Sequence, residues 1–234
     1  SCSPSRASIA TARYPHNHGA PELHTRIDLE NQPFFPQLFK EAGYYTIFSG
    51  KAHGFELETA TWDTAPPAKG PGLQEDWVTL LKNRDKDKPF FAWFASVDAH
   101  RDWQFTGEAP VYDTSDIVVP PLLYDGPGTR AGMAAYYHEV SRTDYYMGAL
   151  MEELKEQGVY ENTIIVHCSD NGRPFPRCKT RCYNSGMKTY LIVGGPGIVK
   201  GRTDALVSTI DIGPTLLELA GIEKDRKMQG VSFK

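Results

Sequence analysis

Apolar and polar positions alternate along this chain in a pattern typical of strands that follow helices. Phe34, Leu38 and Phe39 share one face of a predicted helix, which Gly43 is expected to end. Other apolar segments predict four strands, which lie at 44–49, at 89–97, at the start of 162–172 and at 189–195. A long amphipathic helix is predicted over 129–157 and a last capped helix over 208–221. Strands that alternate with helices predict an α/β fold with a largely parallel central sheet flanked by helices.

The first residues predict a helix with a cysteine at its start. Ser3 followed by Pro4 is typical of a helix N-terminus, so we expect a helix over 4–12 with Cys2 at its N-terminal end. Free backbone N–H groups and the helix dipole favour a bound anion there. Serines and an arginine flank Cys2 instead of apolar residues, which indicates reactivity more than packing.

Polar side chains follow three of the predicted strands. They form three pairs: Lys51 and His53, Asp98 and His100, Asp170 and Asn171. Ligands gather beyond the carboxyl ends of the strands in parallel sheets. The three pairs therefore predict a functional site at one edge of the sheet.

Two of these pairs have both a functional and an ordinary interpretation. Asp170 and Asn171 offer oxygen ligands for a hard cation such as Ca²⁺ or Mg²⁺, but SDNG is also a good turn sequence. Lys51 and His53 point the same way on an extended chain. They could hold an anion and move a proton, or they could be surface groups.

The third pair and a basic loop each have two interpretations as well. Asp98 could orient His100, or both could be ordinary surface groups. Lys179 shares its loop with three arginines, Arg173, Arg177 and Arg181. This loop could form an anion pocket or a basic surface.

Composition narrows the classes of function. The 234 residues are 40% hydrophobic with a net charge of −4, which suits one globular domain over 1–234 and gives no basic surface for nucleic acid. No apolar run reaches the roughly 18 residues of a membrane helix, so we expect no membrane span. Cys178 and Cys182 leave a disulfide possible, because their spacing alone does not decide it.

Several motifs resemble those of the type I sulfatases. The run C-S-P-S-R at 2–6, with Thr11 and Arg13 beyond it, is similar to the family signature C-x-P-S-R and its L-x-T-G-R-like tail. The segment GKAHG at 50–54 is similar to the G-K-x-H segment of the family. SDNG at 169–172, followed by Lys179, is similar to its second metal-and-anion segment, and the order fits along nearly the whole chain.

The resemblance implies an alkaline-phosphatase-like fold and a role for each motif residue. Cys2 would become Cα-formylglycine through a formylglycine-generating or equivalent maturation enzyme, and a hydroxyl of its hydrate would attack sulfur. Ca²⁺, with Mg²⁺ as an alternative, would be held by the modified Cys2 with Asp170 and Asn171. By the same resemblance, Arg6 would stabilise the hydrate, and Lys51 and Lys179 would bind sulfate oxygens. His100 would be the acid that protonates the leaving group and would therefore also contact the substrate. His53 would assist the release of sulfate.

Within the family, the stretches 89–101, 112–121 and 169–176 are similar to those of the heparan N-sulfatases, or sulfamidases. This likeness implies hydrolysis of a sulfated sugar such as N-sulfoglucosamine in a heparan-type glycosaminoglycan. The chain departs from the sulfamidase pattern, with Lys179 in place of arginine and Ala99 in place of proline, and Ala12 replaces the glycine usual in the signature.

Other functions remain open. An O-sulfatase acting on another sulfated glycan is the nearest alternative, and a non-catalytic relative that binds sulfated glycans is a second. A phosphatase or phosphodiesterase on the same fold is a third, which the cysteine of CSPSR argues against because those enzymes use Ser or Thr as nucleophile.

The family resemblance also predicts what the chain lacks. Sulfatases carry a metal-binding Asp pair on a strand upstream of the cysteine motif, and no such strand precedes Ser1. We therefore expect a catalytic domain truncated at both ends, an incomplete metal site and little activity in residues 1–234 alone. Secretion to the periplasm, the lysosome or the outside of the cell is expected from the family.

Overall fold

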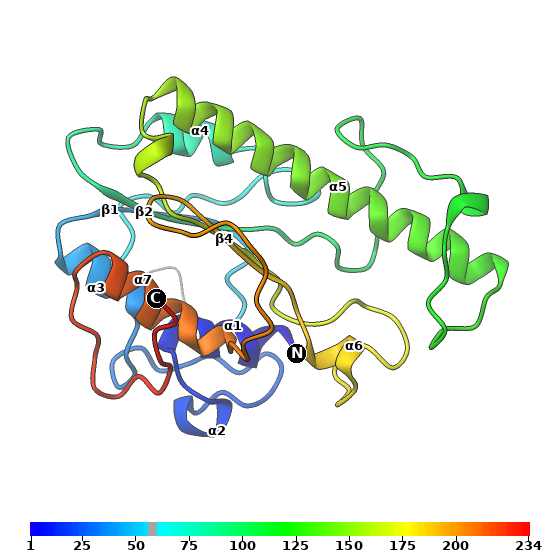
Figure 1. Cartoon of the computed structure of the whole chain (residues 1–234), viewed down its shortest axis with the longest axis horizontal. Coiled ribbons are helices and arrows are strands. Elements are labelled where there is room, and N and C mark those ends of the chain that lie inside the picture. The colour runs from blue at the N-terminus through cyan, green and yellow to red at the C-terminus, as the bar shows by residue number, and fades with distance from the viewer. Residues whose placement is uncertain (56–59) are drawn as a thin grey trace.

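The computed structural model describes residues 1–55 and 60–234 (Figure 1). In chain order its helices and strands are α1 (Cys2–Thr11), α2 (Pro15–His18), α3 (Phe35–Glu41), β1 (Tyr45–Gly50), α4 (Trp77–Lys82), β2 (Phe90–Ala95), α5 (Pro127–Glu156), β3 (Ile165–Cys168), α6 (Asn184–Met187), β4 (Leu191–Gly194) and α7 (Ile212–Leu219). The predicted strands and the predicted long helix all form, with ends shifted by a few residues. The predicted last helix is a 3₁₀ turn at Thr209–Asp211 that continues into α7.

The strands form two pairs. β1 and β2 are parallel, with Tyr45 opposite Phe90 and Gly50 opposite Ala95, whereas β3 and β4 are antiparallel. A parallel neighbour needs a long crossover, usually a helix, and the segment between β3 and β4 contains only the four-residue α6. The α/β fold class is confirmed, and the parallel arrangement holds for the first pair.

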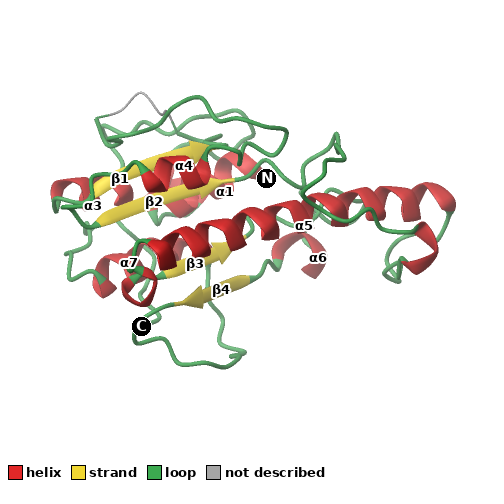
Figure 2. Cartoon of the chain, turned by 90° about the horizontal axis from the view of Figure 1, so that it is seen from above, coloured by secondary structure: helices red, strands yellow, loops and turns green. Residues whose placement is uncertain are grey.

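Helices α4 and α5 lie on one face of the strands, with α4 over β1 and β2 and with α5 crossing between β2 and β3 (Figure 2). Leu150 and Leu154 in the C-terminal half of α5 pack against Phe90 and Phe94 of β2 and against Ile165 of β3. Its N-terminal half extends past the strands and carries the long loops on either side of it (Figure 1). Charged side chains recur along α5, and no helix among the described residues is both long and apolar enough to cross a membrane.

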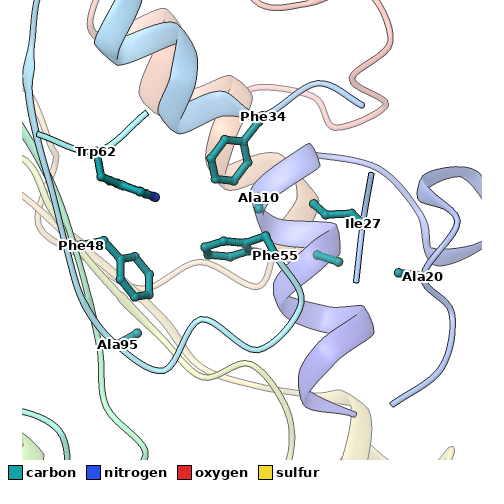
Figure 3. Close-up of a cluster of buried hydrophobic side chains, with 9 residues drawn as sticks. Ala10, Ala20, Ile27, Phe34, Phe48, Phe55, Trp62 and Ala95 are labelled. Atoms are coloured by element: carbon teal, nitrogen blue, oxygen red, sulfur yellow. The ribbon is translucent and has the colours of Figure 1, made fainter. Parts of the chain in front are cut away.

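The opposite face is packed with aromatic side chains against α1, α3 and α7. Figure 3 shows Phe55 in the cluster that joins Phe48 of β1 to Ala10 of α1, and its ring centroid lies 5.3 Å from that of Phe34 and 5.8 Å from that of Phe48. Small residues on α1 let the loop after β1 approach closely. A Cβ on Gly54 would lie 2.7 Å from the backbone oxygen of Ser3.

Helix α1 begins two residues earlier than expected. Cys2 is its first residue and Ser1 its N-cap, so the predicted cap at Ser3 is wrong. The buried Ser3 hydroxyl instead accepts a hydrogen bond from the backbone N–H of His24 at 3.1 Å, which takes it away from the helix end. The prediction that Cys2 lies at a helix N-terminus is confirmed.

Candidate active site

Three chain segments meet at the side chain of Cys2. Cys2 is buried at the first position of α1, with 2% of its surface exposed. The Lys179 ammonium donates to its Sγ at 3.0 Å and the Lys51 ammonium at 3.4 Å, and Asn171 Oδ1 lies 3.4 Å away. Two cations and a helix N-terminus therefore converge on one sulfur atom, an environment suited to an anion.

Arg6, one turn further along α1, ties these segments together. Its Nε donates to Asp170 Oδ2 at 2.7 Å and its Nη1 to the Lys51 carbonyl at 2.6 Å, while the Ser5 hydroxyl donates to the Asp170 carbonyl. The fixed fork of guanidinium donors allows one side chain to orient two strand ends. Arg6 thus holds the loops after β1 and β3 against α1.

The charges at this junction shift two pKa values. Burial disfavours the Asp170 carboxylate, but Arg6 and Lys51 outweigh it and leave the pKa of Asp170 below its usual value. Burial lowers the pKa of the Lys51 ammonium, and the Arg6 cation beside it acts in the same direction. Asp170 is therefore ionised at neutral pH and available as an oxygen ligand or ion-pair partner.

A cavity of about 70 Å³ opens beside Cys2. Seven of the eight predicted site residues line it: Cys2, Arg6, Lys51, His100, Asp170, Asn171 and Lys179. One water molecule needs roughly 10–15 Å³ of such space, so the cavity has room for a small anion. The residues after the three strands thus lie together at one cavity, while their function as a site and the role of each residue stay predictions.

His53, the eighth predicted residue, does not line this cavity. Its Nε2 lies 3.3 Å from Nδ1 of His24, and its Nδ1 is buried without a hydrogen-bond partner among the described residues. Burial lowers the pKa of His53, and the Lys51 and His24 charges add to this effect. No sequence pattern singled out His24, because it lies 29 positions from its partner in an irregular segment.

Asp98 does not orient His100, so that interpretation is wrong. The Asp98 carboxylate instead forms a bidentate ion pair with Arg142 of α5, at 2.6 and 2.8 Å, and both side chains are 1% exposed. Nδ1 of His100 contacts the neighbouring Arg101 carbonyl. Burial without a partner would be costly for Asp98, and Arg142 supplies that partner.

Arg142 also holds the loop that carries His100. Its Nη1 donates to the Gln104 carbonyl at 2.8 Å, and its Nη2 donates to Glu139 Oε1 at 3.2 Å. Glu139 accepts the Gln104 N–H at 2.9 Å, and His138 accepts the Thr106 N–H at 2.9 Å. One buried face of α5 thus anchors the segment that follows β2, and His138 contributes to this anchor.

The basic loop is divided between two cavities. Arg173, together with Tyr136 of α5, lines the cavity beside Cys2. Arg181 lines a second cavity that shares Asp170 and Asn171 with the first. The sequence indicates Arg173 only as part of a basic loop and gives no signal for Tyr136, because the place of Tyr136 at the site depends on how α5 packs.

The cysteines of this loop are free thiols. Cys178 is buried in the cluster under α5, whereas Cys182 is exposed. The disulfide that the sequence left open is therefore not formed. Burial raises the pKa of the Cys168 thiol in β3 to about 11.

Asp170 and Asn171 fit one side of a calcium site. Ca²⁺ takes six to eight oxygen ligands, and these two residues offer a carboxylate and an amide oxygen next to Cys2. Within residues 1–55 and 60–234, no group of three or more His, Cys, Asp or Glu side chains could hold a metal ion. The described residues therefore supply part of such a site.

The comparison with protein-family models identifies the chain's relatives. The Sulfatase family model matches residues 1–68 and 72–222. The chain belongs to the sulfatase family. The expected family and its fold are thereby confirmed, and the cysteine motif, the lysine of GKAHG and the SDNG turn line the same cavity.

Curated relatives of this chain are named for different substrates. Human (Homo sapiens) N-sulphoglucosamine sulphohydrolase is 32% identical over 93% of the chain, and an ulvan-active sulfatase of Formosa agariphila is 28% identical over 99% of it. These matches cover 51% and 46% of the two relatives, so the chain spans about half of their length.

Solved structures share the fold. A Bacteroides thetaiotaomicron protein from a study of glycosaminoglycan metabolism has a TM-score of 0.80 at 21% identity, covering 99% of this chain and 63% of its own. A phosphonate monoester hydrolase from Silicibacter pomeroyi has a TM-score of 0.71 at 19% identity, covering 100% of this chain and 66% of its own. Because a phosphonate monoester hydrolase has this fold as well, the fold alone does not decide the reaction of this chain, and the residues of its site have to do so.

Proposed function

We propose that this sulfatase releases inorganic sulfate from a sulfated sugar, with an N-sulfoglucosamine unit of a heparan-type glycan as the substrate. The observation that carries the proposal is the position of Cys2, whose Sγ lies at the N-terminus of α1 within reach of both Lys51 and Lys179. A sulfuryl group bound there would have cations on two sides and helix N–H groups behind it.

Two groups added to the chain would supply the chemistry. Cα-formylglycine, formed from Cys2 by a maturation enzyme, supplies a hydroxyl nucleophile as its hydrate, and Ca²⁺ supplies positive charge. Asp170 and Asn171 are the residues that would hold the cation. Both donors around Sγ in the structure are N–H groups, which suit an oxygen atom at this position at least as well as sulfur.

The chain's own residues would do the rest. Lys51 and Lys179 hold the sulfate oxygens and balance the charge that develops on them. Arg6 keeps Asp170 and the Lys51 loop in place through its two hydrogen bonds. His100, exposed at the cavity lining, donates a proton to the departing amine or alcohol.

His53 has a separate task in this proposal. Its lowered pKa keeps the imidazole neutral near pH 7, the form that can accept a proton from the hydrate when sulfate is expelled. His24 holds the Nε2 side of the ring, which leaves the buried Nδ1 of His53 free of any partner among the described residues. In this proposal the unpartnered Nδ1 of His53, whose ring lies outside the cavity lining, is the nitrogen that takes the proton.

The preference for a sulfamate over a sulfate ester rests on relatives. The human relative at 32% identity is named for N-sulphoglucosamine, whereas an N-acetylglucosamine-6-sulfatase of Homo sapiens is 26% identical. Lys179 favours the O-sulfatase alternative, because it departs from the arginine that the resemblance to the sulfamidases implies at this position. Both substrates share the same sulfuryl pocket and differ in the leaving group that His100 protonates.

Sulfate release by the whole, matured protein tests the proposal. N-sulfoglucosamine and glucosamine 6-O-sulfate are supplied separately, with the Cys2→Ala variant as the control for contaminating activity. Release from N-sulfoglucosamine alone supports the proposal. Release from the 6-O-sulfate alone makes the protein an O-sulfatase, and release from neither by a protein that carries the aldehyde refutes both. The expected secretion or lysosomal location stays a prediction.

A further inference from the structure

Arg101 lies on an aromatic stack beside the candidate active site. Its guanidinium carbon is 4.4 Å from the ring centroid of Trp103 and 5.4 Å from that of Phe175, and the two rings are stacked 5.6 Å apart. Its Nε donates to the Pro174 carbonyl at 3.3 Å. Cation–π contacts and one hydrogen bond therefore fix the plane of an exposed guanidinium.

The stack itself has a firm base. Phe175 is buried in the cluster beneath α5, and its ring centroid lies 5.7 Å from that of Tyr136. Trp103 packs so closely on α5 that a Cβ on Gly132 would lie 3.3 Å from its ring. Since helix and rings are in direct contact, the loop carrying Arg101 and the loop carrying Pro174 are held together at a set position.

Arg101 is connected to the cavity lining on both loops, by sequence on one and by a hydrogen bond on the other. It follows His100, and the residue that receives its hydrogen bond, Pro174, follows Arg173; His100, Arg173 and Pro174 all line the cavity. Among the described residues, neither Arg101 nor Arg173 forms an ion pair with a carboxylate. The carboxylates that line the cavity, Asp98 and Asp170, are paired with Arg142 and Arg6 instead. The Nε of Arg101 is engaged by the Pro174 carbonyl, and neither Nη group has a hydrogen-bond partner among the described residues.

There are more cationic side chains around the cavity than are required to bind one sulfate group. A sulfate ester or sulfamate carries a single negative charge, and Lys51 and Lys179 already converge on the position it would take. Arg101 and Arg173 add two cations further out. We propose that Arg101, assisted by Arg173, binds a second anionic group of the same saccharide, a sulfate or a carboxylate one position away from the scissile bond.

This inference rests on the proposed function for the identity of the first group, and it adds a selectivity for saccharides with two negative charges. Planar guanidinium donors match the paired oxygens of sulfate and carboxylate, and preorganisation on the stack lowers the entropy lost on binding. Arg101 acts on affinity and takes no part in bond breaking.

Calorimetric titration of the whole protein as its Cys2→Ala variant tests the proposal without turnover. The ligands are N-sulfoglucosamine, glucosamine-2-N,6-O-disulfate, and N-sulfoglucosamine linked to a hexuronate. We expect at least one dianionic saccharide to bind about tenfold tighter than N-sulfoglucosamine, the lower end for a charge-assisted hydrogen bond. The ligand with the advantage shows whether the second group is sulfate or carboxylate.

Two further variants locate the effect. Arg101→Gln in the same background is expected to remove the tenfold advantage while the Kd for N-sulfoglucosamine stays within about twofold, which also shows that the pocket is folded. Lys86→Gln removes the same charge from an exposed loop before β2 and is expected to keep the advantage.

Equal affinities for all three saccharides in the parent protein, or an advantage that survives Arg101→Gln, would overturn the inference. Binding of none of the saccharides would overturn it together with the proposed function. An intact Arg101-dependent advantage, combined with no sulfate release by the matured wild-type protein, would refute the catalytic proposal and leave this binding site standing.

Discussion

Glu139 gives the sharpest test of the buried charge network behind the active site. Its carboxyl is 3% exposed beside Asp98 and Arg142, and its Oε2 has no hydrogen-bond partner among the described residues. Burial raises the pKa of Glu139 to about 7, and the Asp98 charge adds to this effect. The Gln104 N–H and Arg142 act against it without cancelling it. The folded protein therefore holds a proton on Glu139 that the unfolded chain releases above its ordinary pKa of 4.5.

The size of the effect follows from the two pKa values. A rise from 4.5 to about 7 is worth roughly 3 kcal/mol at about 1.4 kcal/mol per pKa unit. Below about pH 4.5 Glu139 is protonated in both the folded and the unfolded state, so its raised pKa does not lower the free energy of unfolding. Between about pH 4.5 and 7 only the folded state keeps the proton, so the free energy of unfolding falls as pH rises, and the loss is complete above about pH 7.

The substitution Glu139→Gln removes this titration while keeping the shape of the side chain. Urea denaturation of both proteins at about pH 4 and about pH 8 should show the variant gaining roughly 3 kcal/mol relative to wild type between the two conditions. Glu156→Gln, on an exposed position of the same helix, should show no comparable change. A difference between wild type and Glu139→Gln that is constant with pH, or that favours wild type at high pH, would refute the reasoning.

Three other substitutions test neighbouring parts of the structure. Arg142→Met should lower the free energy of unfolding in urea by about 3–5 kcal/mol, because it leaves Asp98 buried and unpaired. Adding Asp98→Asn should recover much of this loss. No recovery would mean that the loss comes from packing and not from the unpaired charge. Gly54→Ala should lower the free energy of unfolding by about 1–3 kcal/mol, because its φ is +148° and a Cβ there would meet the backbone of α1. The control Gly107→Ala, where a Cβ would have nothing within 4 Å, should be nearly neutral. Similar losses for both variants would contradict the close approach of Gly54 to α1. Lys179→Ala should lower kcat/KM for sulfate release about 100-fold with unchanged folding, and Lys179→Arg should restore part of it; full activity in Lys179→Ala would exclude it from the sulfate site.

The elements around the site could be predicted because their signals are local. The strand before Lys51 is a short apolar run after Gly43, and the turn at Asp170 and Asn171 follows another such run. Parallel packing of β1 on β2 then brings two strand ends together, as the general rule for such sheets requires. Cys2 was correctly placed at a helix end from Ser3 and Pro4, although the cap itself was wrong.

The supporting contacts could not be predicted because they join distant positions. Asp98 meets Arg142 across 44 positions only after α5 packs over β2, so its sequence neighbour His100 was a reasonable but wrong partner. The contact between His24 and His53 depends on an irregular loop with no period to read. Arg101 ends the stretch 89–101 that resembles the sulfamidases, but nothing in the sequence indicates that it lies over the ring of Trp103.

The most direct test of the central claim is the mass of the peptide that carries Cys2, measured on whole protein that releases sulfate. The account predicts an aldehyde, Cα-formylglycine, in the active fraction, with sulfate release rising in proportion to the converted share across preparations. A fully active protein whose Cys2 is entirely thiol would contradict the account, because no residue near the two lysines would then carry the proposed hydroxyl nucleophile.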